Sequence, residues 1–327
     1  MISPALHGVK ASVQFLVLKS IPGCEIHSGI LFTRAMKTKL ASIIAFTFIA
    51  LAPFARAQET AGKPSIFVCG DSTSKNSGKG KSGEPVAGWG TPIAEFFDSA
   101  KVTIKNVGHA GKSSRTYYDG DWPNVLPQIR SGDYVLLVFG INDGTTPPGL
   151  GDETVTQKGV PVHTYGWYMS KMATDAREKG AHVYLLTVTT RNIWSNPKVK
   201  YRDATPLDQL PADYDPKLDK IERGTGGGKF TQWTKELGQR LHLPVFDLTN
   251  FCADKYETLG RETVNHLYSD HNHTYVPGAE IVASSIVSGL KAFKDSPFVA
   301  MLSEKGKSVP VADAKYVADN SALGGTN

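Results

Sequence analysis

Residues 66–73 read IFVCGDST, four apolar residues that run into a glycine and then a short polar segment. The apolar part, Ile66–Cys69, predicts a buried β-strand that ends at Gly70. Ser72 then falls on the tight turn after the strand, where a hydroxyl is exposed and neighbouring backbone amides can stabilise an anion. Asp and Ser are also common turn and N-cap residues, so an ordinary capped turn explains the segment on its own as well.

Further along the chain, short apolar runs alternate with amphipathic ones, the pattern of βα units around a parallel sheet. The nearly continuous apolar runs at 134–139 and 183–188 are typical of strands that are covered on both faces. Further strands are expected at 102–107 and 245–248, and helices at 91–97, 164–179, 230–241 and 278–293. The chain is therefore predicted to have an α/β fold with a mainly parallel, five-stranded sheet.

The N-terminal part has the three features of a signal peptide between Met36 and Ala57. Lys37 and Lys39 form a short positive region, an apolar stretch covers 40–54, and small alanines follow at the expected cleavage site. We therefore predict a leader over 1–57 and export to the periplasm or the medium. A buried N-terminal helix is the alternative.

The remaining 58–327 are expected to form a single domain, with a loose tail after about 296 and no internal repeat. Residues 1–57 hold six of the 36 basic and one of the 31 acidic residues, which leaves 30 of each in the rest. Such a balanced charge does not indicate a nucleic-acid partner. No stretch after residue 54 is long and apolar enough for a membrane-spanning helix. The two cysteines of this part, Cys69 and Cys252, can be a disulfide or two buried thiols.

Two polar insertions interrupt the order of strands and helices, at 144–159 and at 196–228. The first is rich in Gly, Pro and Thr, and the second is long, charged and ends in three glycines. Loops of this length in a compact domain are usually functional or disordered.

Polar residues follow the predicted strands at the edge where parallel sheets bind ligands. Gly111 follows the second strand, and its backbone N–H can approach a ligand closely; Asn142 follows the third and can donate a hydrogen bond into the same space. Asp270 stands three residues before His273, just ahead of the last helix. A serine nucleophile needs such a histidine as base and such a carboxylate to orient it.

Metal binding by the same histidine-rich segment is the competing interpretation, with His266, His271, His273 and Asp270 as ligands. Their spacing matches no strong zinc motif, and no Cys pair or HExxH segment accompanies them. We therefore predict no metal and no cofactor.

The order of these residues along the chain resembles the SGNH (GDSL-type) hydrolase superfamily over about 65–293. The resemblance implies a three-layer α/β/α sandwich with a flavodoxin-like sheet. It also implies Ser72 as nucleophile, His273 as base and Asp270 as the group that orients the base. The oxyanion hole would consist of the backbone amides of Ser72 and Gly111 and the side chain of Asn142.

A narrower resemblance is to the rhamnogalacturonan acetylesterases. The matching segments are Gly70-Asp71-Ser72-Thr73, Gly88-Trp89-Gly90, residues 110–117 (AGKSSRTY), Asp270-His271-Asn272-His273-Thr274 and Pro277-Gly278-Ala279. The segment around Asn142 departs from the family pattern, because Ile141 stands where a histidine is usual. That position neighbours an oxyanion donor, so the departure concerns substrate preference more than the reaction.

The resemblance implies an esterase that removes acetyl groups from plant cell-wall polysaccharide through an acetyl-enzyme, with rhamnogalacturonan as the expected substrate and the monomer as the working form. Aromatic and hydrogen-bonding side chains suit a sugar ligand better than a lipid. The candidates for substrate contact are Trp89, Arg115, Tyr117, Asn192 and Trp194. The alternatives are the same machinery acting on acetylated xylan or a lipid ester, and a non-catalytic carbohydrate-binding protein on the same fold.

Overall fold

The computed structural model describes residues 62–197, 199–200, 210 and 212–320. The predicted leader therefore lies outside the described residues. Residues 60–327 form one compact unit. Within the described ranges, no helix combines the length and apolar character needed to cross a membrane.

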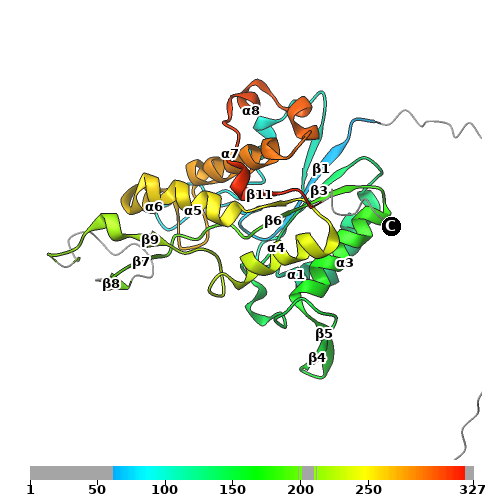
Figure 1. Cartoon of the computed structure of the whole chain (residues 1–327), viewed down its shortest axis with the longest axis horizontal. Coiled ribbons are helices and arrows are strands. Elements are labelled where there is room, and N and C mark those ends of the chain that lie inside the picture. The colour runs from blue at the N-terminus through cyan, green and yellow to red at the C-terminus, as the bar shows by residue number, and fades with distance from the viewer. Residues whose placement is uncertain (1–61, 198, 201–209, 211, 321–327) are drawn as a thin grey trace, which may run out of the picture. The chain divides into compact units, whose positions relative to one another are not determined.

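The core of this unit is a six-stranded sheet in the order β11-β10-β6-β3-β1-β2 (Figure 1). Its strands are β1 (Ser65–Gly70), β2 (Thr103–Asn106), β3 (Tyr134–Val138), β6 (His182–Leu186), β10 (Val245–Phe246) and β11 (Val317–Ala318). The first five are parallel, and β11 pairs antiparallel with β10. In chain order the parallel strands are arranged 2-1-3-4-5, which is the flavodoxin-like order. The predicted five-stranded parallel sheet is confirmed, and the structure adds a short antiparallel edge strand.

Helices cover both faces of the sheet, because successive side chains of a strand point to opposite sides. In β1, Ile66 and Val68 belong to one buried cluster, whereas Phe67 and Cys69 belong to the other. The α-helices are α1 (Ser114–Gly120), α2 (Trp122–Val125), α3 (Tyr165–Glu178), α4 (Lys229–Leu241), α5 (Leu248–Leu259), α6 (Arg261–Leu267), α7 (Val276–Ala292) and α8 (Glu304–Ser308). Side chains of α1 to α4 pack on the Phe67 face, and those of α5 and α7 pack on the Ile66 face. The result is the predicted three-layer α/β/α sandwich.

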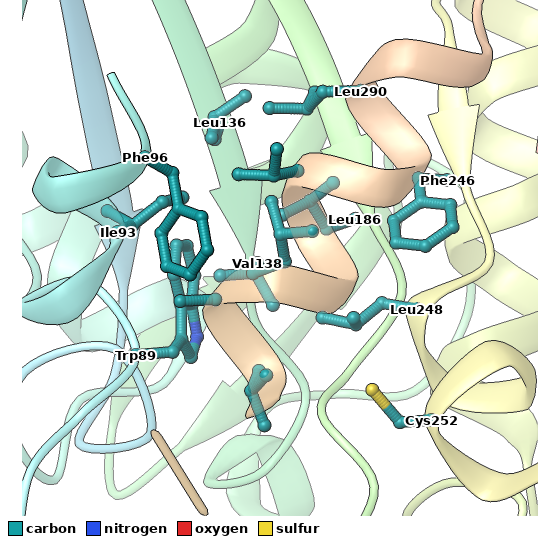
Figure 2. Close-up of a cluster of buried hydrophobic side chains, with 14 of the residues drawn as sticks. Trp89, Ile93, Phe96, Leu136, Val138, Leu186, Phe246, Leu248, Cys252 and Leu290 are labelled. Carbon is teal, nitrogen blue, oxygen red and sulfur yellow. The ribbon is translucent and has the colours of Figure 1, made fainter. Parts of the chain in front are cut away.

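Figure 2 shows the cluster on the Ile66 face, where α7 crosses β3, β6 and β10. Leu290 of α7 lies over Leu136, and Leu248 and Cys252 of α5 complete the lower part of the cluster (Figure 2). Cys69 belongs to the cluster on the opposite face. Both cysteines are free and buried, so the sheet separates the two thiols and they do not pair.

Most predicted elements are found within a residue or two of their expected bounds. The helix expected at 91–97 is instead the 3₁₀ helix η1 (Pro92–Phe96), and α3 ends just before Gly180, whose φ of 82° suits a helix C-terminus. Short 3₁₀ segments connect the other elements. They are η2 (Leu126–Gln128), η3 (Asp143–Thr145), η5 (Pro216–Leu218), η6 (Pro297–Met301) and η7 (Ala314–Tyr316).

Both insertions contain strands outside the main sheet. The first forms the antiparallel hairpin of β4 (Thr154–Gln157) and β5 (Val160–His163), which projects from the domain in Figure 1. In the second, β8 (Val199–Lys200) and β9 (Lys220–Ile221) pair with β7 (Trp194–Asn196). Parts of this insertion lie outside the described residues.

The chain after residue 296 differs from the loose tail that its sequence suggests. Phe298 is fully buried, and its ring packs against Tyr134 and Tyr184 of the sheet. The segment continues through α8 and ends in β11 on the sheet edge. Apolar residues that are too few to show a period therefore still anchor the tail to the domain.

Three glycines pack around the turn that follows β1. A Cβ atom on Gly88 would lie 2.3 Å from the carbonyl carbon of Ser74, and one on Gly108 would lie 2.3 Å from the Ser74 hydroxyl oxygen. Gly90 is in a similar position, with its N–H donating to the Ser74 carbonyl at 3.0 Å. The Gly88-Trp89-Gly90 segment thus allows a second stretch of backbone to lie against this turn.

We expect Gly88→Ala to lower the free energy of unfolding by about 1–3 kcal/mol, because the added methyl group meets backbone atoms that cannot move aside. Equilibrium urea denaturation measures the change. Gly144→Ala is the matched control, since a Cβ there meets no atom within 4 Å, and it should alter stability by less than about 0.5 kcal/mol. Equal stability of the two variants would contradict the packing role of Gly88.

Candidate active site

Polar residues that are far apart in sequence meet at the carboxyl ends of the parallel strands. Ser72 follows β1 directly, and Asn142 follows β3. The loop between α6 and α7 brings His273 to Ser72, 201 positions away in the chain. Ligands bind at this edge in open α/β sheets, so the fold places these groups where a substrate can reach them.

Ser72, His273 and Asp270 form a continuous line of hydrogen bonds. The Nε2 atom of His273 lies 2.9 Å from Ser72 Oγ, and its Nδ1 atom lies 2.8 Å from Asp270 Oδ2. Ser72 is only 7% exposed, whereas the side chains of His273 and Asp270 are 28% and 29% exposed. The three groups therefore have the spacing and order that proton transfer from a serine hydroxyl to a histidine requires.

The carboxylate of Asp270 is held by its own loop. Its Oδ1 atom accepts the backbone N–H groups of Asn272 and His273 at 2.7 and 2.8 Å. Partial burial acts to raise the pKa of Asp270, but the hydrogen bonds from the His273 side chain and from these two N–H groups outweigh it and lower the pKa. Asp270 therefore stays ionised beside the imidazole at neutral pH.

The loop that carries His273 is attached to the segment that follows the β1 turn. Thr274 and Ala87 exchange hydrogen bonds, because the Ala87 N–H donates to the Thr274 carbonyl and the Thr274 hydroxyl donates to the Ala87 carbonyl. Val86 and Tyr275 form an isolated antiparallel bridge beside them. These contacts fix the position of the His273 loop relative to the turn that carries Ser72.

Gly111 and Asn142 lie in the loops after β2 and β3. Gly111 has a φ of 77°, and a Cβ there would meet no atom within 4 Å, so the space beside it is open. Asn142 lies in the bridge region at φ −101° and ψ 8°, where many active-site residues are found. Its Nδ2 group donates one hydrogen bond to the Lys112 carbonyl at 3.1 Å, which leaves the second N–H for a ligand.

Two buried aspartates support these loops, and sequence inspection did not single them out. Asp143 accepts the backbone N–H and the hydroxyl of Ser114 and the hydroxyl of Thr146. It thereby ties the start of α1, just after Gly111, to the loop of Asn142. Burial raises the pKa of Asp143 against the effect of these hydrogen bonds. Its position directly after Asn142 is the signal that could have found it.

Asp71 plays the same part in the β1 turn. Its Oδ1 atom accepts the backbone N–H and the hydroxyl of Thr73 at 2.8 and 2.7 Å. Burial raises the pKa of Asp71 to about 6, although the hydrogen bonds from Thr73 act in the opposite direction. The carboxyl group therefore stabilises the turn that carries Ser72.

Four of the five residues expected to contact substrate are buried. Trp89 lies within the Ile66-face cluster (Figure 2), and Tyr117 packs on Phe139 while its hydroxyl donates to the Val107 carbonyl. Trp194 donates its indole N–H to Asn192 Oδ1 at 2.8 Å. These aromatic rings are core groups, because their apolar area is worth more in the interior than at the surface.

Asn192 and Arg115 differ from these rings. The Asn192 backbone N–H donates to the His271 carbonyl at 2.9 Å, so this buried residue supports the loop of the imidazole. Arg115, on the first turn of α1, is partly exposed and remains accessible to a ligand.

The histidine-rich segment does not gather a set of metal ligands. Across the described residues, no three His, Cys, Asp or Glu side chains are grouped closely enough to hold a metal ion. His266 lies in the last turn of α6, and His273 is hydrogen-bonded to Ser72 and Asp270.

Comparison with known proteins agrees with this geometry. Residues 68–273 match the model of the GDSL-like lipase/acylhydrolase family. A rhamnogalacturonan acetylesterase from Emericella nidulans is 31% identical over 76% of this chain and 90% of its own length. The rhamnogalacturonan acetylesterase RhgT from Bacillus subtilis is 26% identical over 69% of this chain and 89% of its own length.

The fold has a counterpart among solved structures as well. The crystal structure of YxiM from Bacillus subtilis superposes with a TM-score of 0.52 and 20% identity, over 71% of this chain and 57% of that chain. The family match includes both Ser72 and His273 and covers more than half of the chain. The protein is therefore a carboxylic ester hydrolase that belongs to the GDSL-like lipase/acylhydrolase family.

Proposed function

We propose that this acetylesterase of the SGNH type removes acetyl groups from plant cell-wall polysaccharide, and that its substrate is the rhamnogalacturonan of pectin. The observation that carries the proposal is the line of hydrogen bonds from Ser72 through His273 to Asp270. The names of the relatives from Emericella nidulans and Bacillus subtilis support the choice of polysaccharide.

In the first half of the reaction, Ser72 Oγ attacks the acetyl carbonyl carbon. The serine proton moves to His273 Nε2, and the ionised Asp270 stabilises the imidazolium through Nδ1. The carbonyl oxygen becomes an oxyanion, which accepts hydrogen bonds from the backbone N–H groups of Ser72 and Gly111 and from Asn142 Nδ2. When the intermediate collapses, His273 returns the proton to the departing sugar oxygen and the acetyl group stays on Ser72.

In the second half, water replaces the sugar. His273 takes a proton from the water as its oxygen attacks the acetyl-Ser72 carbonyl, and the same donors hold the new oxyanion. Collapse releases acetic acid, which ionises to acetate, and restores the Ser72 hydroxyl with the proton held by His273. His273 carries the proton in every transfer between oxygen atoms, and no redox step occurs.

We also propose that the protein acts outside the cytoplasm and as a monomer. The basis for export is the signal-peptide pattern between Met36 and Ala57, which precedes the described residues. A polysaccharide too large to enter a cell requires an exported enzyme. Its partner is then the acetylated glycan itself, with no nucleic acid and no membrane anchor after the leader is removed.

Ser72→Ala and His273→Ala are each expected to lower kcat on p-nitrophenyl acetate by a factor of 10³ or more, because each removes a group that takes part in bond formation. His271→Ala is the matched control from the same loop and should lower kcat far less. Circular dichroism establishes that the variants fold. If His271→Ala lost as much as Ser72→Ala while His273→Ala stayed active, His273 would not be the base.

Asn142→Ala is expected to lower kcat by about 10²–10³ with little change in KM, because an oxyanion donor acts mainly in the transition state. Steady-state kinetics on p-nitrophenyl acetate separates the two constants. A large rise in KM with unchanged kcat would instead make Asn142 a group that binds the ground state.

The substrate is tested by acetate release from acetylated rhamnogalacturonan, xylan and mannan, and we expect the highest kcat/KM on rhamnogalacturonan. Equal or greater activity on xylan would favour the alternative ester substrate.

Dialysis against EDTA should leave the acetate release unchanged, because the attacking oxygen belongs to Ser72 rather than to metal-bound water. Loss of activity with EDTA and its return with zinc would favour a metal site.

A further inference from the structure

A hollow of about 750 Å³ lies beside the residues expected to hold the oxyanion. Arg115 of α1 lines one side, residues 144–148 line the base, and Gln157 and Lys158 of the β4–β5 hairpin line the other side. The volume is within the range of small-ligand sites. None of the residues that line it belongs to the Ser72–His273–Asp270 line.

Two short stretches of chain connect the lining of the hollow to residues of the candidate site. Its lining begins at Gly144, two residues after Asn142, so their Cα atoms are at most about 7 Å apart. On the other side, Arg115 follows Ser114, which is hydrogen-bonded to Asp143. The hollow therefore borders the loop that carries Asn142, the side chain expected to hold the oxyanion.

The charge of the lining is positive. Of the described residues that line the hollow, two are cationic and none is acidic. Asp119, one turn further along α1, carries an opposing charge, and its carboxyl group interacts with both Arg115 and His163. Burial raises the pKa of Asp119 despite these two cations. Asp119 is not among the residues that line the hollow, whose charged side chains are Arg115 and Lys158.

Gln157 holds the arginine in place. Arg115 Nη1 donates to Gln157 Oε1 at 2.8 Å, and Gln157 Nε2 donates to the Thr145 carbonyl at 3.1 Å. One side chain therefore joins α1, the hairpin and the base of the hollow. The guanidinium has five N–H groups in a fixed plane, so this single contact orients it and leaves donors for a planar anion.

Lys158 occupies a position that disfavours it. The hairpin turn consists of Lys158 and Gly159, with φ of 51° and 79°. Two positive φ values define a type I′ turn, in which Asn or Gly is preferred over Lys at the first position. The backbone conformation is therefore uncommon for a lysine, and the turn places the charge of Lys158 in the lining of the hollow.

We propose that this hollow is a subsite for the carboxylate of a uronic acid in the bound glycan chain. The Arg115 guanidinium donates two parallel hydrogen bonds to the carboxylate, and Lys158 adds a point charge from the hairpin tip. The proposal rests on the proposed function, since it assigns the acidic component of the same polysaccharide to particular residues. It predicts that the enzyme selects an acidic glycan over a neutral one.

The test compares kcat/KM on acetylated rhamnogalacturonan, which carries uronates, with kcat/KM on acetylated xylan of low uronate content. For Arg115→Gln and Lys158→Asn, we expect the ratio of the two constants to fall about tenfold, mainly through KM on the acidic glycan. Lys158→Asn suits the type I′ turn, so a folding defect does not explain its effect. Lys158→Arg should keep the ratio, and added salt should reduce it in the wild type.

Lys307→Gln is the matched control, because it removes the same charge from the exposed surface of α8 and should leave the ratio unchanged. An unchanged ratio in both Arg115→Gln and Lys158→Asn would overturn the subsite, even if the enzyme deacetylates rhamnogalacturonan. A fall in the ratio for Lys307→Gln equal to theirs would also overturn it, since the effect would then be general electrostatics.

Binding of unacetylated oligogalacturonate separates this proposal from the proposed function. Calorimetry on wild type and on Arg115→Gln measures the subsite without any ester. Weaker binding to the variant supports the subsite even if acetate release from rhamnogalacturonan is not observed. Equal binding to both proteins overturns the subsite and leaves the choice of polysaccharide to the acetate assay.

Discussion

The hydrogen bond of 2.9 Å between His273 Nε2 and Ser72 Oγ joins the turn after β1 to the loop before α7. The hydroxyl is set by the first strand and the imidazole by the start of the last long helix, so both must be placed within a few tenths of an ångström. Backbone contacts provide this placement. The exchange of hydrogen bonds between Ala87 and Thr274 fixes the distance between the two loops, and the glycines around Ser74 let the chain approach closely enough to make it.

Three carboxyl groups complete the support of the site. Asp71 holds the serine turn, Asp143 holds the Asn142 loop against α1, and Asp270 holds the imidazole. Their environments differ in a way that matches their roles. Burial dominates at Asp71 and Asp143 and raises the pKa of each, whereas hydrogen bonds dominate at Asp270 and lower its pKa. The carboxylate that faces the histidine is thus the one that stays charged most readily.

The two insertions add surface segments to the layers of the sandwich. The β4–β5 hairpin forms one wall of the hollow beside Asn142, and Gln157 connects that wall to α1. Asn192, just before the second insertion, donates its backbone N–H to the carbonyl of His271. Substitution in these segments can therefore alter the choice of glycan while the line from Ser72 to Asp270 is kept.

The sequence by itself determined the parallel sheet, the main helices and the three residues that meet at the reaction centre. Strands such as Ile66–Cys69 can be predicted because burial on both faces requires an unbroken apolar run. Ser72 and His273 stand at strand and helix ends, and the resemblance to the SGNH superfamily implied their roles. Tertiary structure alone decided that Trp89 and Tyr117 belong to the core, since a single aromatic residue has no period that reports its burial. It also decided that the tail packs on the sheet through Phe298, and that Arg115 and Lys158, 43 positions apart, line one hollow. These outcomes depend on contacts between distant segments, and local sequence does not encode such contacts.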